Sequence, residues 1–138
     1  MARRIFIVLA AALFSLASGA NVITQRSVVN GVTVAVTAGN LGPDASVWDF
    51  AVVLRAADNR ILSDDLVKNA VLVDPRGKRH QVLVWEGAAA ESQHRAGVLK
   101  FIALSPRPEY IELRIVRSGE KKPRTFNWLL GSGMMASR

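Results

Sequence analysis

Apolar and polar residues alternate along most of the chain after its first 20 residues. The clearest case is residues 47–55, where every second residue is large and apolar and the residues between them are mixed or charged. Successive side chains of a strand point to opposite faces, so this segment predicts a strand with one buried face. The residues expected on the buried face are Trp48, Phe50, Val52 and Leu54. We expect Phe126 and Trp128, near the end of the chain, to pack in the same core.

Turn signals divide the alternating pattern into short strands. The strongest is Asn30-Gly31, because both central residues of a two-residue hairpin turn adopt positive φ. Residues 63–66 contain a cap for one helical turn. The expected strands cover residues 22–29, 32–38, 47–55, 71–74, 78–85, 98–104, 110–117 and 125–130. Seven or eight short strands with frequent turns favour an all-β fold, a single antiparallel immunoglobulin-like β-sandwich.

The stretch from Trp85 to Phe101 interrupts this alternation. It is polar and rich in Ala and Gly, and it holds His94, one of only two histidines. We interpret it as a structured loop between two strands. Gly97 is expected to give the backbone freedom that lets the next strand begin at Val98.

The first 20 residues have the features of an export signal. Arg3 and Arg4 precede an uncharged apolar run over residues 5–16, and Ser18-Gly19-Ala20 places small residues where a signal peptidase cuts. The run is shorter than the roughly 18–20 residues that span a bilayer. The sequence therefore predicts a signal peptide at residues 1–20, a sandwich domain at 21–131, a disordered tail at 132–138, and a periplasmic or secreted protein without a stable membrane span after cleavage.

Cysteine is absent, which excludes disulfides, thiolate metal sites and Cys nucleophiles. The fold must then depend on its hydrophobic core, and half of all residues are hydrophobic.

The net charge of +7 is unevenly distributed. Residues 21–75 hold four basic and six acidic residues, whereas residues 76–138 hold twelve basic and five acidic ones. Such a bias suits nucleic acid, anionic lipid or an acidic partner. Nucleic-acid surfaces usually interleave aromatic residues with the charge, and here the aromatics are assigned to the core. We therefore expect mainly solvated strand faces, no nucleic-acid binding, and an unidentified protein or cell-envelope component as partner.

Residues that carry catalysis are sparse. His80 and His94 are the only imidazole bases, no serine lies in a Gly-x-Ser-x-Gly turn, and there is no glycine-rich phosphate loop. The sequence predicts no enzyme activity and no cofactor. A periplasmic metal-binding or metal-delivery module is the alternative, with His94, Glu86 and Glu91 as candidate ligands. One imidazole alone makes a weak site, so two or three of these ligands would have to converge.

Five motifs stand out along the chain: W-D-F-A-V-V-L at 48–54, I-L-S-D-D-L at 61–66, V-L-V-D at 71–74 with Gly77, W-E-G at 85–87 and H-R-A-G-V-L-K-F at 94–101. Together these motifs resemble those of a family of small exported bacterial and archaeal β-sandwich proteins without an assigned activity. The resemblance covers roughly residues 31–130 and implies the sandwich fold but no substrate. Family members often carry further histidines near positions 55–57 and 92–94, which this chain lacks apart from His94.

Two polar segments within these motifs lie outside the expected strands and carry opposite charges. Asp64 and Asp65 lie in one, and His94 and Arg95 in the other. Because the charges are complementary, we expect a contact between the two segments, with Arg95 or His94 paired to an Asp carboxylate. Its role would be structural first.

Overall fold

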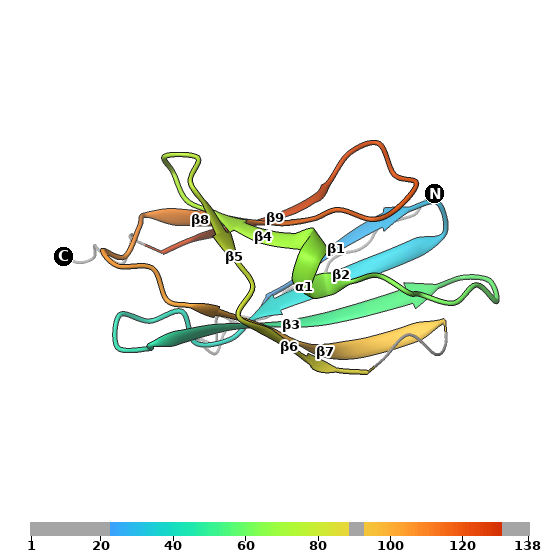
Figure 1. Cartoon of the computed structure of the whole chain (residues 1–138), viewed down its shortest axis with the longest axis horizontal. Helices are drawn as coiled ribbons and strands as arrows, with labels where there is room; N and C mark the ends of the chain where they lie inside the picture. Colours follow the sequence, from blue (N-terminus) through green and yellow to red (C-terminus); the bar gives the residue numbers. More distant parts are fainter. Residues whose placement is uncertain (1–22, 89–92, 131–138) are drawn as a thin grey trace.

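The structure, a computed structural model, describes residues 23–88 and 93–130, which form nine strands and one short helix in two layers (Figure 1). The expected signal peptide and tail lie outside the described residues. All strand pairs are antiparallel. The fold is the all-β sandwich that the alternation predicts.

One layer is a five-stranded sheet in the order β1-β2-β3-β7-β6. Its strands are β1 (Thr24–Val29), β2 (Val32–Ala38), β3 (Val47–Ala56), β6 (Val84–Gly87) and β7 (His94–Ile102). The other layer is a four-stranded sheet in the order β5-β4-β8-β9. Its strands are β4 (Ala70–Val73), β5 (Arg79–Gln81), β8 (Tyr110–Ile115) and β9 (Arg124–Leu129), and helix α1 (Leu66–Asn69) precedes β4.

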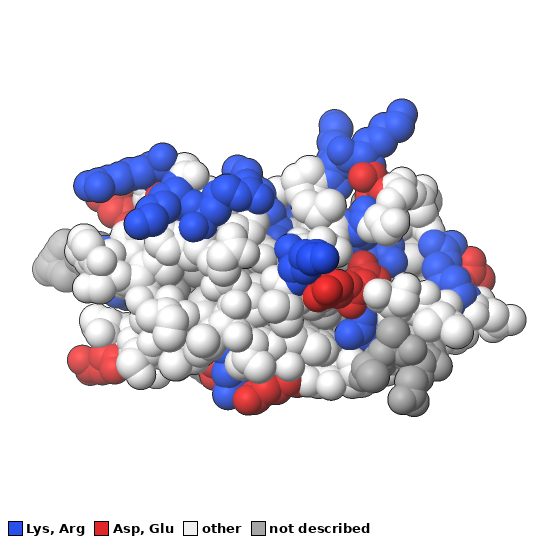
Figure 2. Space-filling view, viewed as in Figure 1, with Lys and Arg blue, Asp and Glu red and all other residues white. Residues whose placement is uncertain are grey.

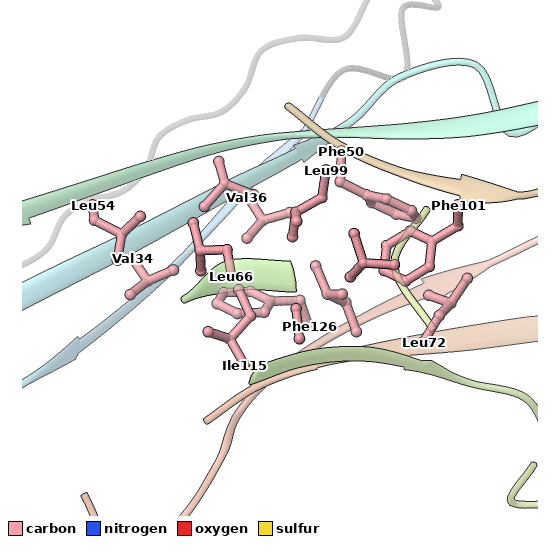
Figure 3. Close-up of a cluster of buried hydrophobic side chains, with 14 of the residues drawn as sticks. Val34, Val36, Phe50, Leu54, Leu66, Leu72, Leu99, Phe101, Ile115 and Phe126 are labelled. Carbon is pink, nitrogen blue, oxygen red and sulfur yellow. The ribbon is translucent and has the colours of Figure 1, made fainter. Parts of the chain in front are cut away.

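The core lies between the two sheets (Figure 3). All four predicted side chains of β3 are buried, as is Phe126 of β9. The Phe50 ring meets the Phe101 ring edge-on at 5.6 Å between centroids and the Trp128 ring at 5.0 Å. The predicted facing of β3 and its contact with the last strand are therefore confirmed.

The expected strand over residues 78–85 is two strands in different sheets. β5 pairs with β4, the chain crosses the sandwich at Val82 and Leu83, and β6 pairs with β7. Val82 is buried and Leu83 is exposed, so the apolar alternation continues through the crossing. The two-residue alternation of apolar and polar side chains continues where the chain changes sheet, as it does within one strand. The sequence pattern therefore predicted one strand where the structure has two.

The expected loop before Val98 is also wrong in part, because β6 and β7 extend into it. Gly97 lies inside β7 and is directly opposite Gly87. A Cβ on Gly97 would come within 2.6 Å of the Gly87 Cα atom and 2.7 Å of the Trp85 ring. The glycine pair thus makes room for the Trp85 indole against the strands, and the need for glycine here is a close approach, not a turn.

The hairpin turn agrees with its prediction: Asn30 and Gly31 have φ values of 52° and 76°. No helix within the described residues has the length and apolar character needed to cross a membrane.

Candidate functional site

Arg95, expected to bridge two polar segments, lies on the inward face at the start of β7 and is buried. Its Nη1 donates to the main-chain oxygens of Asp64, at 2.7 Å, and of Leu62, at 3.2 Å. Its Nε and Nη2 donate to the main-chain oxygen of Ala88 at 3.2 and 3.1 Å. The guanidinium carbon lies 5.6 Å from the centre of the Trp85 ring. Arg95 therefore ties the segment before α1 to the end of β6.

The predicted contact between Arg95 and Asp64 is present, but Arg95 binds the main-chain oxygen of Asp64 and not its carboxylate. The Asp64 carboxylate binds Arg117, with Nε to Oδ2 at 2.8 Å and Nη2 to Oδ1 at 3.2 Å. The Asp65 carboxylate accepts from the backbone N–H of Lys68 and caps α1, as the sequence suggested. His94 is exposed on β7. Each carboxylate thus has a structural partner other than Arg95.

The candidate metal ligands are not brought together where the structure describes them. Glu86 pairs with Lys100 at 3.0 Å, and the hydrogen bond that Lys100 donates to this carboxylate raises the pKa of Lys100. Glu86 is opposite Val98, four residues along β7 from His94, or about 13 Å in an extended strand. Glu91 lies outside the described residues. Within those residues, no three His, Asp or Glu side chains are grouped to hold a metal ion.

His80, the second histidine, is committed to the turn between β4 and β5. Its Nε2 lies 3.1 Å from Oδ2 of Asp74, and this hydrogen bond holds the pKa of Asp74 below its ordinary value. Asp74 Oδ1 also accepts from the N–H groups of Arg76 and Lys78. This cluster shapes a turn.

At one end of the sandwich, a buried chain of charges links the segment before α1 to the β8–β9 loop and the start of β9, and the sequence did not predict it. Arg117 bridges Asp64 and Glu120, and Glu120 in turn binds Arg124 through two hydrogen bonds of 2.9 and 2.6 Å. The two positive and two negative side chains balance. The two Arg124 hydrogen bonds, together with the one from Arg117, overcome burial and lower the pKa of Glu120. Burial opposes the charge of Arg117, but the hydrogen bonds and charges of Asp64 and Glu120 outweigh it and raise its pKa.

Arg124 also holds the β1–β2 hairpin in place. Its two Nη atoms donate to the main-chain oxygens of Ser27, Val29 and Val32 at 2.7 to 3.1 Å. The guanidinium is almost completely buried under the hairpin. Because Arg124 is the first residue of β9, it fixes the edge strand of one sheet beside the edge strand of the other.

Further along the same side, Gln25 of β1 bridges to β9. Its side-chain amide donates to the main-chain oxygen of Asn127 at 2.8 Å, and its side-chain oxygen accepts from the Asn127 N–H at 3.1 Å. The N–H and C=O groups of Asn127 both point away from β8. The Gln25 side chain can therefore bind both of them. Gln25 thus caps the free edge of β9.

A basic groove lies between the hairpin and the loop that follows β8. Its volume is 700 Å³. Figure 2 shows Lys and Arg side chains gathered over this loop and over the turn between β4 and β5. The residues lining the basic groove are Arg26, Ser27, Val29, Asn30, Gly119, Glu120, Lys121, Lys122, Pro123, Arg124 and Thr125.

A second groove, of 680 Å³ and with a mixed lining, continues along the same side beyond the Gln25–Asn127 bridge. We call it the apolar groove after the exposed Ile23 and Leu129 that line it. Ile23 and Leu129 flank it with exposed fractions of 68% and 81%. Arg107 lines its far end, where the guanidinium donates to the main-chain oxygens of Leu41 and Leu130. Its remaining lining is Gln25, Ala38, Gly39, Asn40, Gly42, Asn127 and Trp128.

Most Lys and Arg residues of the described chain are exposed, as expected, but three arginines have little contact with solvent. Arg95 and Arg124 are buried, and Arg117 is nearly so. In a chain without Cys, these guanidinium groups connect loops and sheets by donating to carbonyl and carboxylate oxygens.

Comparisons of the chain with protein-family models, with curated proteins and with solved structures found no match. The resemblance to a family of small exported sandwich proteins therefore stays a prediction.

Proposed function

We propose that this protein is a non-catalytic exported β-sandwich domain that binds a protein or cell-envelope partner, and that the exposed edge of β1 is its binding surface. The observation that carries the proposal is the state of this edge. Within the described residues, β1 pairs with β2 on one side and with no strand on the other. Unpaired edges invite strand addition, and proteins usually protect them.

The other edge strands are short or covered. β5 has three residues and β6 has four, and the β6 edge carries the charged Glu86. β9 has six residues, but Gln25 covers the main-chain groups of Asn127. β1 also has six residues, and its only charge is Arg26. Two of its apolar side chains face solvent, Val28 with 67% exposed and Val29 with 39%. β1 is therefore the long edge with the least protection.

The hairpin fixes which main-chain groups of β1 are free. In a two-residue turn, the flanking pair Val29 and Val32 is hydrogen-bonded. The Ala57 N–H donates to the Gly31 oxygen, so the main-chain groups of Gly31 and of every second residue after it in β2 point toward β3. The main-chain groups of Val32 then point toward β1, in agreement with this assignment. Since hydrogen-bonded and non-hydrogen-bonded pairs alternate, the N–H and C=O groups of Thr24, Arg26 and Val28 point away from the sheet.

Site-specific photo-crosslinking in the producing cell tests the proposal. A photoreactive residue replaces Val28 on β1 or, as a control, Ile102 at the end of β7, which is similarly exposed at 60%. We expect one discrete protein adduct from position 28 and none from position 102. Adding Arg26→Pro should abolish the adduct, since it removes an outward N–H while leaving the β1–β2 hydrogen bonds intact. Equal or absent crosslinking at both positions would contradict the proposal.

Export is tested separately. The proposed signal rests on the pattern of residues 1–20, and N-terminal sequencing of protein recovered from the envelope should give a chain that begins at or near Asn21. A mature chain that retains Met1 would contradict export by cleavage.

A further inference from the structure

We infer that the partner of the β1 edge is an extended protein segment that is acidic in its N-terminal half and apolar in its C-terminal half. This inference rests on the proposed function and specifies the chemistry of the partner. It follows from the unequal character of the two grooves that lie along β1.

The main chain of β1 selects an extended segment. The outward N–H and C=O groups of Thr24, Arg26 and Val28 are spaced for pairing with another strand. A strand added there gains main-chain hydrogen bonds whatever its sequence, and its side chains determine specificity. A membrane surface or a folded convex partner would leave these groups paired only to water.

The end of β1 near the hairpin turn selects negative charge. Arg26, Lys121 and Lys122 border the basic groove and are exposed, and none of the three forms an ion pair within residues 23–88 and 93–130. The acid in this groove, Glu120, is neutralised by Arg117 and Arg124. The groove therefore carries about three uncompensated positive charges and complements carboxylates.

The beginning of β1 selects apolar side chains. Ile23 and Leu129 are two of the most exposed large apolar residues of the described chain. Ile23, just before β1, and Leu129, at the end of β9, both line the apolar groove. The partly buried Trp128 ring also lines this groove. Exposed apolar residues gathered at one place indicate a binding surface more strongly than the same residues scattered singly.

The direction of the segment follows from the strand pairing. Every neighbouring pair in both sheets is antiparallel, and antiparallel pairs are slightly more stable per residue. β1 runs from its apolar end at Thr24 to its basic end at Val29. An antiparallel partner strand meets the basic groove first, so its acidic residues precede its apolar ones.

A second copy of this chain fits the edge poorly. β1 contains one charge, Arg26, and no acid. Pairing of two β1 strands about their middle would place the two Arg26 side chains near each other, and like charges opposite one another destabilise a sheet. Charge therefore favours a different, acidic chain.

The test is selection of displayed random 12-residue peptides on the immobilised full-length protein, followed by titration of the enriched peptides as synthetic ligands. We expect enriched sequences with Asp or Glu in the first half and Val, Ile, Leu or aromatic residues in the second. Lys121→Glu with Lys122→Glu should weaken their binding by about tenfold or more, because each change reverses a charge at the groove. The matched control, Arg76→Glu with Lys78→Glu in the β4–β5 turn, should leave it unchanged.

Other outcomes overturn the inference. Enriched peptides without an acidic first half, or peptides whose binding survives both Val28→Pro and the groove charge reversal, would contradict it. Binding to vesicles of phosphatidylglycerol that depends on Lys121 and Lys122, with no peptide enriched, would assign the groove to a membrane surface instead. If position 28 crosslinks to a protein in the cell but peptides lack the acidic bias, the edge remains the binding surface and only the inferred chemistry fails.

Discussion

Two arginines, Arg117 and Arg95, bind different groups of Asp64. A pair of double-mutant cycles separates their contributions to stability. Arg117 binds the Asp64 carboxylate through two atoms, and the exposed fractions of these side chains are 11% and 5%. Arg95 binds only the main-chain oxygen of Asp64. Replacing Asp64 by Ala removes the first interaction and leaves the second intact.

The expected coupling energies follow from this geometry. Arg117→Ala and Asp64→Ala should couple by about 0.5–3 kcal/mol, the range for contacting residues in one salt-bridge network. Arg95→Ala and Asp64→Ala should couple by less than about 0.5 kcal/mol. Arg95→Ala alone should still cost about 2–4 kcal/mol of unfolding free energy, because the buried Leu62 oxygen loses its donor and the contact with the Trp85 ring is lost.

Urea unfolding, followed by tryptophan fluorescence, measures these energies. Urea is preferable to guanidinium chloride, which is a salt and screens ion pairs. Each variant needs an unchanged dependence of free energy on urea for the cycle to be valid. Additive losses for Arg117 and Asp64, together with strong coupling between Arg95 and Asp64, would refute the described arrangement.

Three further outcomes test the core, the ionic chain and the glycine pair. Phe50→Ala should lower the unfolding free energy by about 3–5 kcal/mol, measured in urea, since Phe50 is fully buried; a loss below about 1 kcal/mol would contradict the packing. Hydrogen bonds from Arg124 lower the pKa of Glu120 below its ordinary 4.5, so its contribution is complete above about pH 5 and declines as the pH falls through the depressed pKa. Glu120→Gln should therefore be less stable near neutral pH and lose less stability on acidification than the parent; parallel pH curves in thermal melts would contradict this. Gly97→Ala should cost about 1–3 kcal/mol because its Cβ would clash with Gly87, and an unchanged melting temperature would show that the strands can separate there.

The sequence pattern was sufficient wherever one local rule determined the structure. The alternation in residues 47–55 determined which face of β3 is buried, because only one face carries large apolar side chains. Asn30 and Gly31 determined a turn with positive φ. A cap for one helical turn was recognisable within residues 63–66, and the structure shows that Asp65 is the capping residue.

The same pattern failed where the chain changes sheet or where two glycines meet. The crossing at Val82 keeps an alternating period, so nothing local separates β5 from β6. Gly87 and Gly97 interrupt the alternation of apolar residues, although both lie in strands, because each is selected by the close approach of the other. Such requirements depend on residues that are distant in sequence.

The candidate site was predictable only in part. Lys121 and Lys122 are adjacent in the sequence, but the strand edge beside them is defined only by the strand order. Arg124 binds three main-chain oxygens that lie 92 to 97 residues earlier in the chain. Every residue has a main-chain oxygen, so the sequence does not indicate which of them accept hydrogen bonds. The contact between Arg95 and Asp64 was expected from opposite charges, yet it uses a carbonyl oxygen, which every residue has.

Amide hydrogen exchange along β1 tests the central claim most directly. In the free protein, the N–H groups of Arg26 and Val28 should exchange rapidly, while those of Ser27 and Val29, which face β2, should be protected. Addition of an enriched acidic peptide, or of the partner captured at position 28, should protect Arg26 and Val28 and leave the exposed turn at Lys78 unchanged. Protection of Arg26 and Val28 in the free monomer, or no change on binding, would contradict the claim that the β1 edge is the binding surface.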